Sequence, residues 1–177
     1  KIEIFSEKLL QFTEGWELQD GDTLKGMSTL PPLPVYIPEW YGVESTTDEF
    51  PLVLTGFHYR GRIHSSWGFI EDLKEVNPQE AWINPLDAQE RGIEQGDTIR
   101  VKNQFGIIEL LAKVTSRVVP GTVAVSQGAW HMADMYSDPE RVDRGGSINT
   151  LTTQRPSPLS KGNPQHTNIC QVEKVSA

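Results

Sequence analysis

The stretch of this sequence best suited to chemistry runs from Thr55 to Trp67 and follows the apolar run Pro51–Leu54, which predicts a buried strand. It contains two arginines, two histidines, two serines and two glycines. Arginine binds phosphate oxygens through a bidentate fork, glycine lets the backbone approach a ligand closely, and histidine or tryptophan packs on a flat heterocycle. Such a loop at the end of a strand is typical of a site for an anionic ligand that carries a ring. A solvated loop without a specific ligand is about equally compatible with the composition alone.

Two further polar clusters lie downstream. In residues 144–152, the pair Gly145-Gly146 can turn successive backbone N–H groups toward an anion, and serine, asparagine and threonine side chains follow it. Taken alone, these residues slightly favour a glycine turn that leads into a short strand. The third cluster, residues 161–168, precedes a predicted last strand. Three polar clusters in one small domain favour a ligand site over three unrelated loops.

The sequence contains no recognisable catalytic motif. Ser65 and Ser66 lack the G-x-S-x-G pattern of α/β-hydrolases, so a small hydrolase is only a third hypothesis. The four histidines lack the H-E-x-x-H spacing of zinc proteases, and neither a Walker A nor a Rossmann glycine pattern is present. The single Cys170 excludes an intrachain disulfide and a multi-cysteine metal site, and we expect it in the core. We therefore expect no catalytic and no metal-ligating residue in this chain.

Length and charge limit the function further. A chain of 177 residues is long enough for one domain and an additional segment. The net charge of -8 argues against nucleic-acid binding, and no apolar run approaches the roughly 20 residues that span a bilayer. Residues 1–50 contain three Lys and Arg against ten Asp and Glu, whereas residues 101–177 contain eight against six, so an anionic ligand is expected on the later part. The chain opens on Lys1 without a signal peptide, and we expect a piece of a longer protein whose missing part lies upstream.

Short strands and short helices must position these clusters. The pattern predicts a strand at 1–5, a helical turn or a loop at 8–12, an extended proline-rich connector at 30–38, helices at 67–76 and 85–91, and strands at 81–83, 98–102, 107–114, 123–125 and 167–175. Asn84 is expected to cap the second helix and Gly92 to end it. Residues 132–165 show little periodicity, so we expect them to wrap a ligand or another domain. The closely spaced turns predict a compact β structure that begins near Phe50.

Several motifs occur along the chain in a fixed order. They are Ala81-Trp82-Ile83-Asn84-Pro85-Leu86-Asp87-Ala88, Gly92-Ile93, Gly96-Asp97-Thr98-Ile99-Arg100-Val101, Gly106, Val119-Pro120-Gly121 and Gly145-Gly146-Ser147-Ile148-Asn149-Thr150-Leu151-Thr152. Together they resemble the C-terminal molybdopterin dinucleotide-binding domain of the dimethyl sulfoxide reductase family. The run His64–Trp67 and the connector Pro34–Trp40 look closest to the catalytic A chain of anaerobic, membrane-associated dimethyl sulfoxide reductases and their selenate reductase-like relatives.

The resemblance implies a fold that is mainly β with short helices, a double-psi β-barrel of the aspartate decarboxylase-like type. It would occupy residues 50–177, after an acidic, proline-rich lead-in over residues 1–49. In the family this domain closes over bis(molybdopterin guanine dinucleotide), while upstream domains hold the molybdenum and any iron–sulfur cluster. The resemblance implies cofactor contacts for Gly56, Arg60, His64, Ser65, Ser66, Trp67, Gln127, Gly128, Trp130, Ser147, Asn149, Thr152, His166, Thr167 and Asn168.

The implied parent is a molybdenum oxidoreductase of anaerobic respiration that reduces S-oxides or related oxyanions and is periplasmic or membrane-associated. Its partners would be the upstream domains of the same chain, an iron–sulfur subunit and a membrane anchor, without nucleic acid and without direct insertion of this piece into the membrane. The isolated piece is expected to be inactive. The alternative from another class is a free-standing double-psi barrel that serves as a protein-interaction module, for which an acidic surface without a ligand cleft would be expected.

Overall fold

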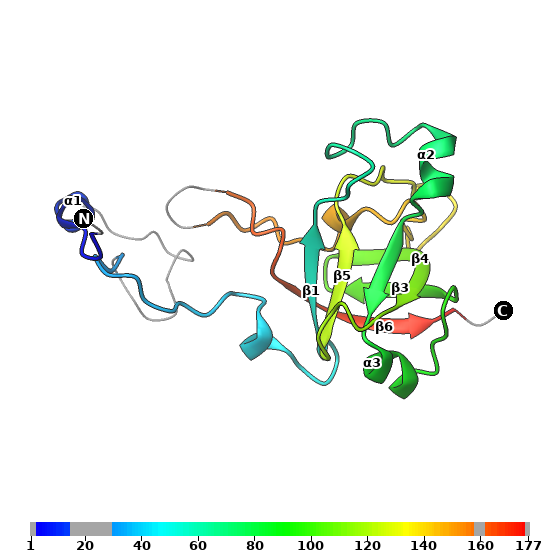
Figure 1. Ribbon diagram of the computed structural model, residues 1–177, viewed down its shortest axis with the longest axis horizontal. Helices are drawn as coiled ribbons and strands as arrows, with labels where there is room; N and C mark the ends of the chain where they lie inside the picture. The colour runs from blue at the N-terminus through cyan, green and yellow to red at the C-terminus, as the bar shows by residue number, and fades with distance from the viewer. Residues whose placement is uncertain (1–2, 15–29, 158–161, 176–177) are drawn as a thin grey trace. The chain divides into compact units, whose positions relative to one another are not determined.

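The computed structural model describes residues 3–14, 30–157 and 162–175 (Figure 1). Its contacts divide the chain into two units, Lys1–Glu39 with Gln154–Pro164, and Trp40–Thr153 with Gln165–Ala177. In the first unit, Ser6 caps α1 (Glu7–Thr13), because its Oγ accepts a hydrogen bond from the Leu9 backbone N–H at 3.1 Å. The helical turn expected at 8–12 is confirmed. The strand expected at 1–5 is not formed by the described residues 3–5, because the chain there turns into the cap of α1.

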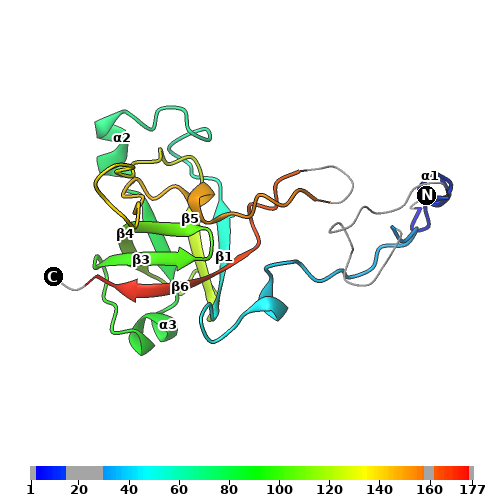
Figure 2. The same cartoon turned by 180° about the vertical axis from the view of Figure 1, so that it is seen from behind.

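Within the described residues of the second unit, six strands close into a barrel in the order β1-β5-β2-β4-β3-β6. They are β1 (Leu52–Phe57), β2 (Glu80–Ile83), β3 (Thr98–Asn103), β4 (Gly106–Val114), β5 (Thr122–Ser126) and β6 (Asn168–Lys174). β1 is parallel to β5 and β2 is parallel to β4, whereas the other neighbouring strands are antiparallel. Figure 1 shows β1, β5 and β2 from the front, and Figure 2 shows β3, β4 and β6 on the other side. The closed barrel agrees with the expected fold class.

The barrel is filled by aliphatic side chains that alternate along the strands. In β3 the even spacing places Ile99 and Val101 inside, both fully buried, while Arg100 and Lys102 face outward. Leu54, Ile83 and other aliphatic residues from the remaining strands complete the same cluster. Each fully buried side chain of this kind stabilises the fold by roughly 1.5 to 3 kcal/mol. Ile148 and Leu151 belong to the same cluster, so the polar segment 144–152 is anchored in the core.

The motif Asn-Pro-x-Asp holds a helix against a distant turn. Asn84 caps α3 (Pro85–Glu90) by accepting a hydrogen bond from the Leu86 N–H at 3.0 Å, and its Nδ2 donates to the Val118 carbonyl at 2.7 Å. Asp87 Oδ2 accepts a hydrogen bond from the Gly121 N–H at 2.8 Å. The predicted cap and helix are confirmed, and the motif fixes the Pro-Gly turn that leads into β5.

The helix expected at 67–76 is shorter than predicted. α2 spans Glu71–Val76, and residues 67–70 form turns. Trp67 has φ +64°, in the left-handed region that an α-helix cannot contain, so the helix begins only after it. Residues 148–151 form the 3-10 helix η2 (Ile148–Leu151) where a short strand was one reading. Between β5 and η2 the chain is irregular, as expected. α2 and α3 lie at opposite ends of the barrel (Figure 1).

The single cysteine lies inside the core and should not react with thiol reagents while the chain is folded. Cys170 pairs with Leu52 across β6 and β1 and is fully buried. Burial raises the pKa of its thiol to about 12, although Arg91 opposes the shift. At pH 8 the thiolate fraction is therefore on the order of 10⁻⁴.

We expect a maleimide reagent to leave Cys170 of the folded chain unlabelled over minutes and to label it fully in denaturing urea, as read by mass spectrometry. Rapid labelling of the folded chain would contradict the placement of Cys170 in the core.

Candidate functional site

Two loops that carry predicted site residues leave the barrel at the same end. β1 and β5 are parallel neighbours, and Phe57 of β1 is in register with Ser126 of β5. The backbone N–H of Gln127 donates to the Phe57 carbonyl at 2.9 Å, which continues the ladder by one step. The segments that follow β1 and β5 therefore begin side by side, beyond the two upward arrows in Figure 1. Parallel pairing thus joins residues that are far apart in the sequence.

A glutamine outside these loops connects them. Gln79 lies immediately before β2, and its Nε2 donates to the carbonyls of Ser126 at 3.0 Å and Gly146 at 2.9 Å. Its Oε1 accepts hydrogen bonds from Arg62 Nη2 at 2.5 Å and from Ser126 Oγ at 2.6 Å. Arg62 also donates through Nε to the Gln127 carbonyl at 2.9 Å and through Nη2 to Ser126 Oγ at 2.9 Å. This network joins the loop after β1, the end of β5 and the glycine turn at 145–146.

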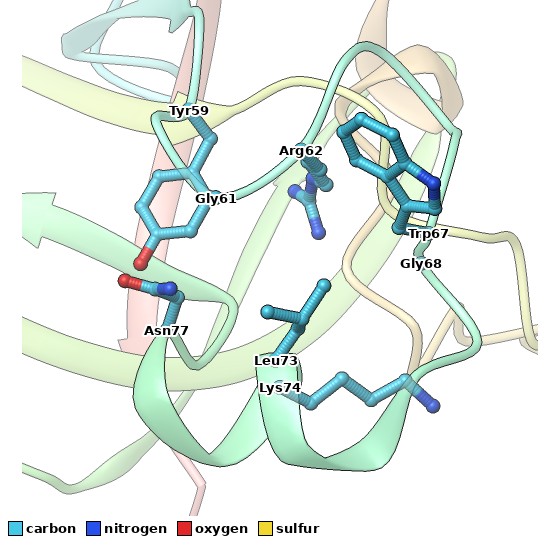
Figure 3. Close-up of a pocket in the computed structure, with 8 residues that line it drawn as sticks. All are labelled: Tyr59, Gly61, Arg62, Trp67, Gly68, Leu73, Lys74 and Asn77. Atoms are coloured by element: carbon cyan, nitrogen blue, oxygen red, sulfur yellow. The ribbon is translucent and has the colours of Figure 1, made fainter.

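The two arginines of the first loop differ in their surroundings. The Arg62 guanidinium lies 5.5 Å from the ring centre of Tyr59, and burial lowers its pKa, while Tyr59 opposes the shift. Figure 3 shows Arg62 with Tyr59, Trp67 and Leu73, which line the same small pocket. Arg60 is exposed and makes no hydrogen bond or ion pair with the residues that the structure describes. Arg60, the arginine predicted from the sequence as a site residue, is therefore accessible to an anion. The guanidinium of Arg62 instead donates hydrogen bonds to other residues of the network.

The loops also interlock through close backbone contacts. Trp130 Nε1 donates to the Ser65 carbonyl at 2.8 Å. Gly128 has φ +85°, and a Cβ at that position would lie 1.7 Å from the His64 carbonyl oxygen. A Cβ at Gly145 would lie 1.8 Å from the Trp130 carbonyl oxygen. Glycine is thus required at both contacts, because any larger residue would push the loops apart.

A buried carboxylate organises the irregular segment after β5. Asp143 is fully buried, and its Oδ1 accepts hydrogen bonds from the backbone N–H groups of Met132 at 2.8 Å and Gly145 at 2.9 Å. Its Oδ2 accepts from the Ser147 N–H at 2.9 Å and from Thr150 Oγ1 at 3.0 Å. Four hydrogen-bond donors thus compensate the free-energy cost of burying the carboxylate in the low-dielectric interior of the protein. The predicted anion nest at 144–152 is occupied in part by the chain's own carboxylate.

The third polar cluster joins the first on the other side of the β1 loop. His166 Nδ1 lies 2.8 Å from the Gly56 carbonyl oxygen, and its Nε2 lies 3.2 Å from Gln127 Nε2. Because a carbonyl oxygen can only accept, Nδ1 carries the proton and Nε2 accepts from the amide, so this geometry assigns the neutral Nδ1–H tautomer. Gln165 Nε2 donates to Asn149 Oδ1 at 2.9 Å. The first two polar clusters and residues 165–168 of the third therefore meet at one end of the barrel, while Lys161 lies outside the described residues.

A cavity of about 530 Å³ opens between α2 and the segments 129–132 and 144–145. Its walls include the cations Arg62, Lys74 and Arg144 against one carboxylate, Glu71. The rings of Phe69 and Trp130 also line the cavity, with centroids 6.0 Å apart. A cavity of this size, with cations and aromatic rings, suits a nucleotide-sized anionic group that carries a ring.

The predicted site residues fall into three groups by exposure. The exposed ones are Arg60, His64, Ser65, Ser66, Trp67, Trp130, Asn149 and His166, the half-buried ones are Gly56, Gly128 and Thr167, and the buried ones are Gln127, Ser147, Thr152 and Asn168. Asn168 accepts from the Thr153 N–H and donates to the Gln165 carbonyl, both at 3.2 Å, so its amide supports the loop from inside. For every one of these residues, contact with a ligand stays a prediction. Sequence reasoning missed Gln79 and Asp143, since single polar residues outside a motif carry no local signal.

Comparisons with known proteins place these features in context. The family described as "Molydopterin dinucleotide binding domain" matches residues 52–169. The probable dimethyl sulfoxide reductase chain YnfF and the dimethyl sulfoxide reductase DmsA, both from Escherichia coli K12, are each 52% identical over 99% of this chain, which covers 21% and 20% of their lengths. Trimethylamine-N-oxide reductase 1 of Escherichia coli O157:H7 is 34% identical over 72% of the chain and 16% of its own length. This chain thus spans about a fifth of the length of its most similar curated relatives.

A solved structure supports the fold separately. The acetylene hydratase from Pelobacter acetylenicus superimposes with a TM-score of 0.65 over 85% of this chain and 22% of its own, at 21% sequence identity. An identity this low shows a common fold and carries no information on the reaction. The expected double-psi barrel class is confirmed by the closed strand order together with this match.

The interlocked loops generate a prediction with a matched control. Gly121 and Gly128 both have positive φ, +80° and +85°, but a Cβ at Gly121 would meet nothing within 4 Å. We expect Gly121→Ala to cost about 1 to 2 kcal/mol of unfolding free energy from backbone strain alone. Gly128→Ala should cost more than this and should also move the indole N–H resonance of Trp130, because the loop at His64 must shift. Equal losses in urea unfolding, with an unchanged Trp130 resonance, would contradict the close loop contact.

The buried carboxylate generates a second prediction. Asp143→Asn turns one acceptor oxygen into a donor that faces other donors, so we expect a loss of about 2 to 4 kcal/mol in the free energy of unfolding. Asp134→Asn is the matched control in the same segment, because Asp134 is exposed and accepts hydrogen bonds from the N–H groups of Tyr136 and Ser137. Urea denaturation of both variants measures the difference. A loss for Asp143→Asn no larger than that of the control would show that the four hydrogen bonds do not hold the segment.

Proposed function

This chain belongs to the molybdopterin dinucleotide-binding domain family, with the dimethyl sulfoxide reductases among its relatives, and we propose that it closes over bis(molybdopterin guanine dinucleotide) in a molybdenum oxidoreductase. The single observation that carries the site assignment is the convergence of the loop after β1, the glycine turn at 145–146 and residues 165–168 at one end of the barrel. The proposed reaction of the whole enzyme is the reduction of S-oxides, as in the dimethyl sulfoxide reductases among the relatives, or of related oxyanions. The family match favours this function over a free-standing interaction module.

The residues at this end fit the chemistry of such a cofactor. Its pyrophosphates are anionic, and Arg60 supplies an exposed cation on the loop after β1, while Lys74 and Arg144, paired with Glu71 and Asp138, line the neighbouring cavity. Its pterin and guanine rings are flat, and Trp130 and Phe69 supply aromatic faces. When bound, the molybdenum cofactor supplies the oxygen-atom transfer chemistry. This chain's residues would bind and orient the cofactor and exclude water from it.

Several polar side chains are exposed on the side of the loops that is proposed to meet the cofactor. Ser66, Asn149 and His166 join Arg60 on the exposed side of the loops, and the 2.8 Å contact with Gly56 fixes the orientation of the His166 ring. Neither Ser65 nor Ser66 makes a side-chain hydrogen bond to a histidine within the described part of the chain, where a hydrolase would need such a pair. In the proposal these serines therefore act as hydrogen-bonding groups toward the cofactor.

The proposal extends to the parent protein. We assign the molybdenum ligand and any iron–sulfur cluster to upstream domains, with an iron–sulfur subunit and a membrane anchor as further partners. A periplasmic or membrane-associated location follows from the same family resemblance. Among the described residues, no helix is both long and apolar enough to cross a membrane. The chain itself is proposed to be inactive without the rest of the enzyme.

Titration with guanosine diphosphate tests the cofactor assignment. We expect backbone amide resonances to shift at 56–67, 127–131, 145–152 and 164–168 and to titrate at millimolar ligand, where a binding free energy of roughly 4 kcal/mol is still detected. Arg60→Gln should weaken this binding severalfold, because one cation at the loops is removed. Arg117→Gln is the matched control, since Arg117 is also exposed but lies over Trp82 at 5.1 Å. Shifts elsewhere, or none up to about 10 mM, would contradict recognition by these loops.

A further inference from the structure

We propose that Gln79 is a positioning residue that sets the spacing of the three cofactor-facing segments, an inference that rests on the proposed function. Gln79 lies just before β2, outside every polar cluster of the sequence. Its side chain nevertheless reaches the β1 loop through Arg62, the end of β5 through Ser126 and the glycine turn through Gly146. One carboxamide thus holds together three segments that carry predicted cofactor residues.

The hydrogen-bonding capacity of a carboxamide matches this position. A glutamine has two N–H donors and one oxygen that accepts two hydrogen bonds. Both donors are used, at 3.0 and 2.9 Å, and both acceptor positions are filled, at 2.5 and 2.6 Å. A glutamate at this position would keep the acceptor oxygens but face the carbonyls of Ser126 and Gly146 without a donor. A methionine of similar length would remove all four hydrogen bonds.

Two of the three partners of Gln79 stand next to a residue of the predicted site. Ser126 directly precedes Gln127, whose carbonyl accepts from the same Arg62 at 2.9 Å. Gly146 directly precedes Ser147, and a Cβ at Gly146 would lie 3.0 Å from Gln79 Cγ, so the turn packs closely on the glutamine. A displacement of the Gln79 side chain is therefore passed to these neighbours through the backbone. Gln79 also lines the 530 Å³ cavity, so its position affects the wall of that cavity.

A positioning role and a purely structural role make different predictions. A structural residue would affect the unfolding temperature and leave the environment of the bound cofactor unchanged. A positioning residue would change the spectrum and potential of the molybdenum. It would also change the rate, because small displacements of the groups around a reacting centre have large effects on rate. The readout must therefore report on the cofactor as well as on stability.

The test uses the full-length holoenzyme with Gln79→Met, Gln79→Glu and the control Gln95→Met. Gln95 is an exposed glutamine whose Oε1 accepts a hydrogen bond from the Val114 N–H at 2.9 Å, in a turn outside the candidate site. The measurements are molybdenum content, the electron paramagnetic resonance spectrum and midpoint potential of molybdenum, kcat and KM for dimethyl sulfoxide, and Tm.

We expect Gln79→Met to alter the spectrum and the potential and to lower kcat roughly ten- to a hundredfold with KM changed less than about threefold. Gln79→Glu should keep the link to Arg62 and should regain activity as the pH falls, because the protonated carboxyl group recovers one donor. Gln95→Met should behave as the wild type.

A lower Tm with an unchanged spectrum, potential and kcat per molybdenum in both Gln79 variants would overturn the proposal. If Gln79→Met fails to fold, the proposal is tested by Gln79→Glu alone, through the change of its activity with pH. Absence of molybdopterin guanine dinucleotide from the wild-type enzyme would instead refute the proposed function.

Discussion

The structure of the candidate site depends on the parallel pairing of β1 with β5 in a closed barrel. This pairing makes both strands end on one side, with Phe57 beside Ser126, so the chain that follows each strand has to share the same space. The close approach of Gly128 to the His64 carbonyl is a direct result. Since barrel closure also pairs β1 with β6, the cluster around His166 is brought to the same loop. One arrangement of strands therefore assembles residues from three parts of the sequence.

Two polar side chains then fix the geometry of these loops. Asp143 uses four donors and Gln79 uses four hydrogen-bonding positions, so neither leaves a polar group without compensation. Polar networks that are fully satisfied specify a single arrangement, because any alternative loses several hydrogen bonds at once. Irregular loops lack the repeating backbone ladder of strands and helices, so these two side chains supply the order that secondary structure provides elsewhere.

The sequence predicted the barrel strands and α3 well, because apolar alternation and the Asn84-Pro85 cap are local signals, but the strand expected at 1–5 is not formed by the described residues 3–5. The start of α2 was wrong, because the left-handed backbone of Trp67 has no signature in a helical pattern of apolar residues. Arg60 and Arg62 cannot be distinguished by sequence, since only the fold shows which one reaches Gln79. Gln79 escaped prediction because its partners lie on distant segments, and residue spacing does not reveal such long-range contacts. The donors to Asp143 lie within its own irregular segment, which has no repeating pattern that would single out one carboxylate.

The place of β1 in the barrel has a consequence for synthesis of the chain. β1 is paired only with β5 and β6 in the closed barrel, and β6 begins at Asn168 near the end of the chain. At a translation rate of about 5 to 20 residues per second, β1 leaves the ribosome on the order of ten seconds before its second partner exists. During that interval its unpaired edge can bind other strands and promote aggregation. A chaperone that covers this edge would therefore act on the nascent chain, well before any cofactor is inserted.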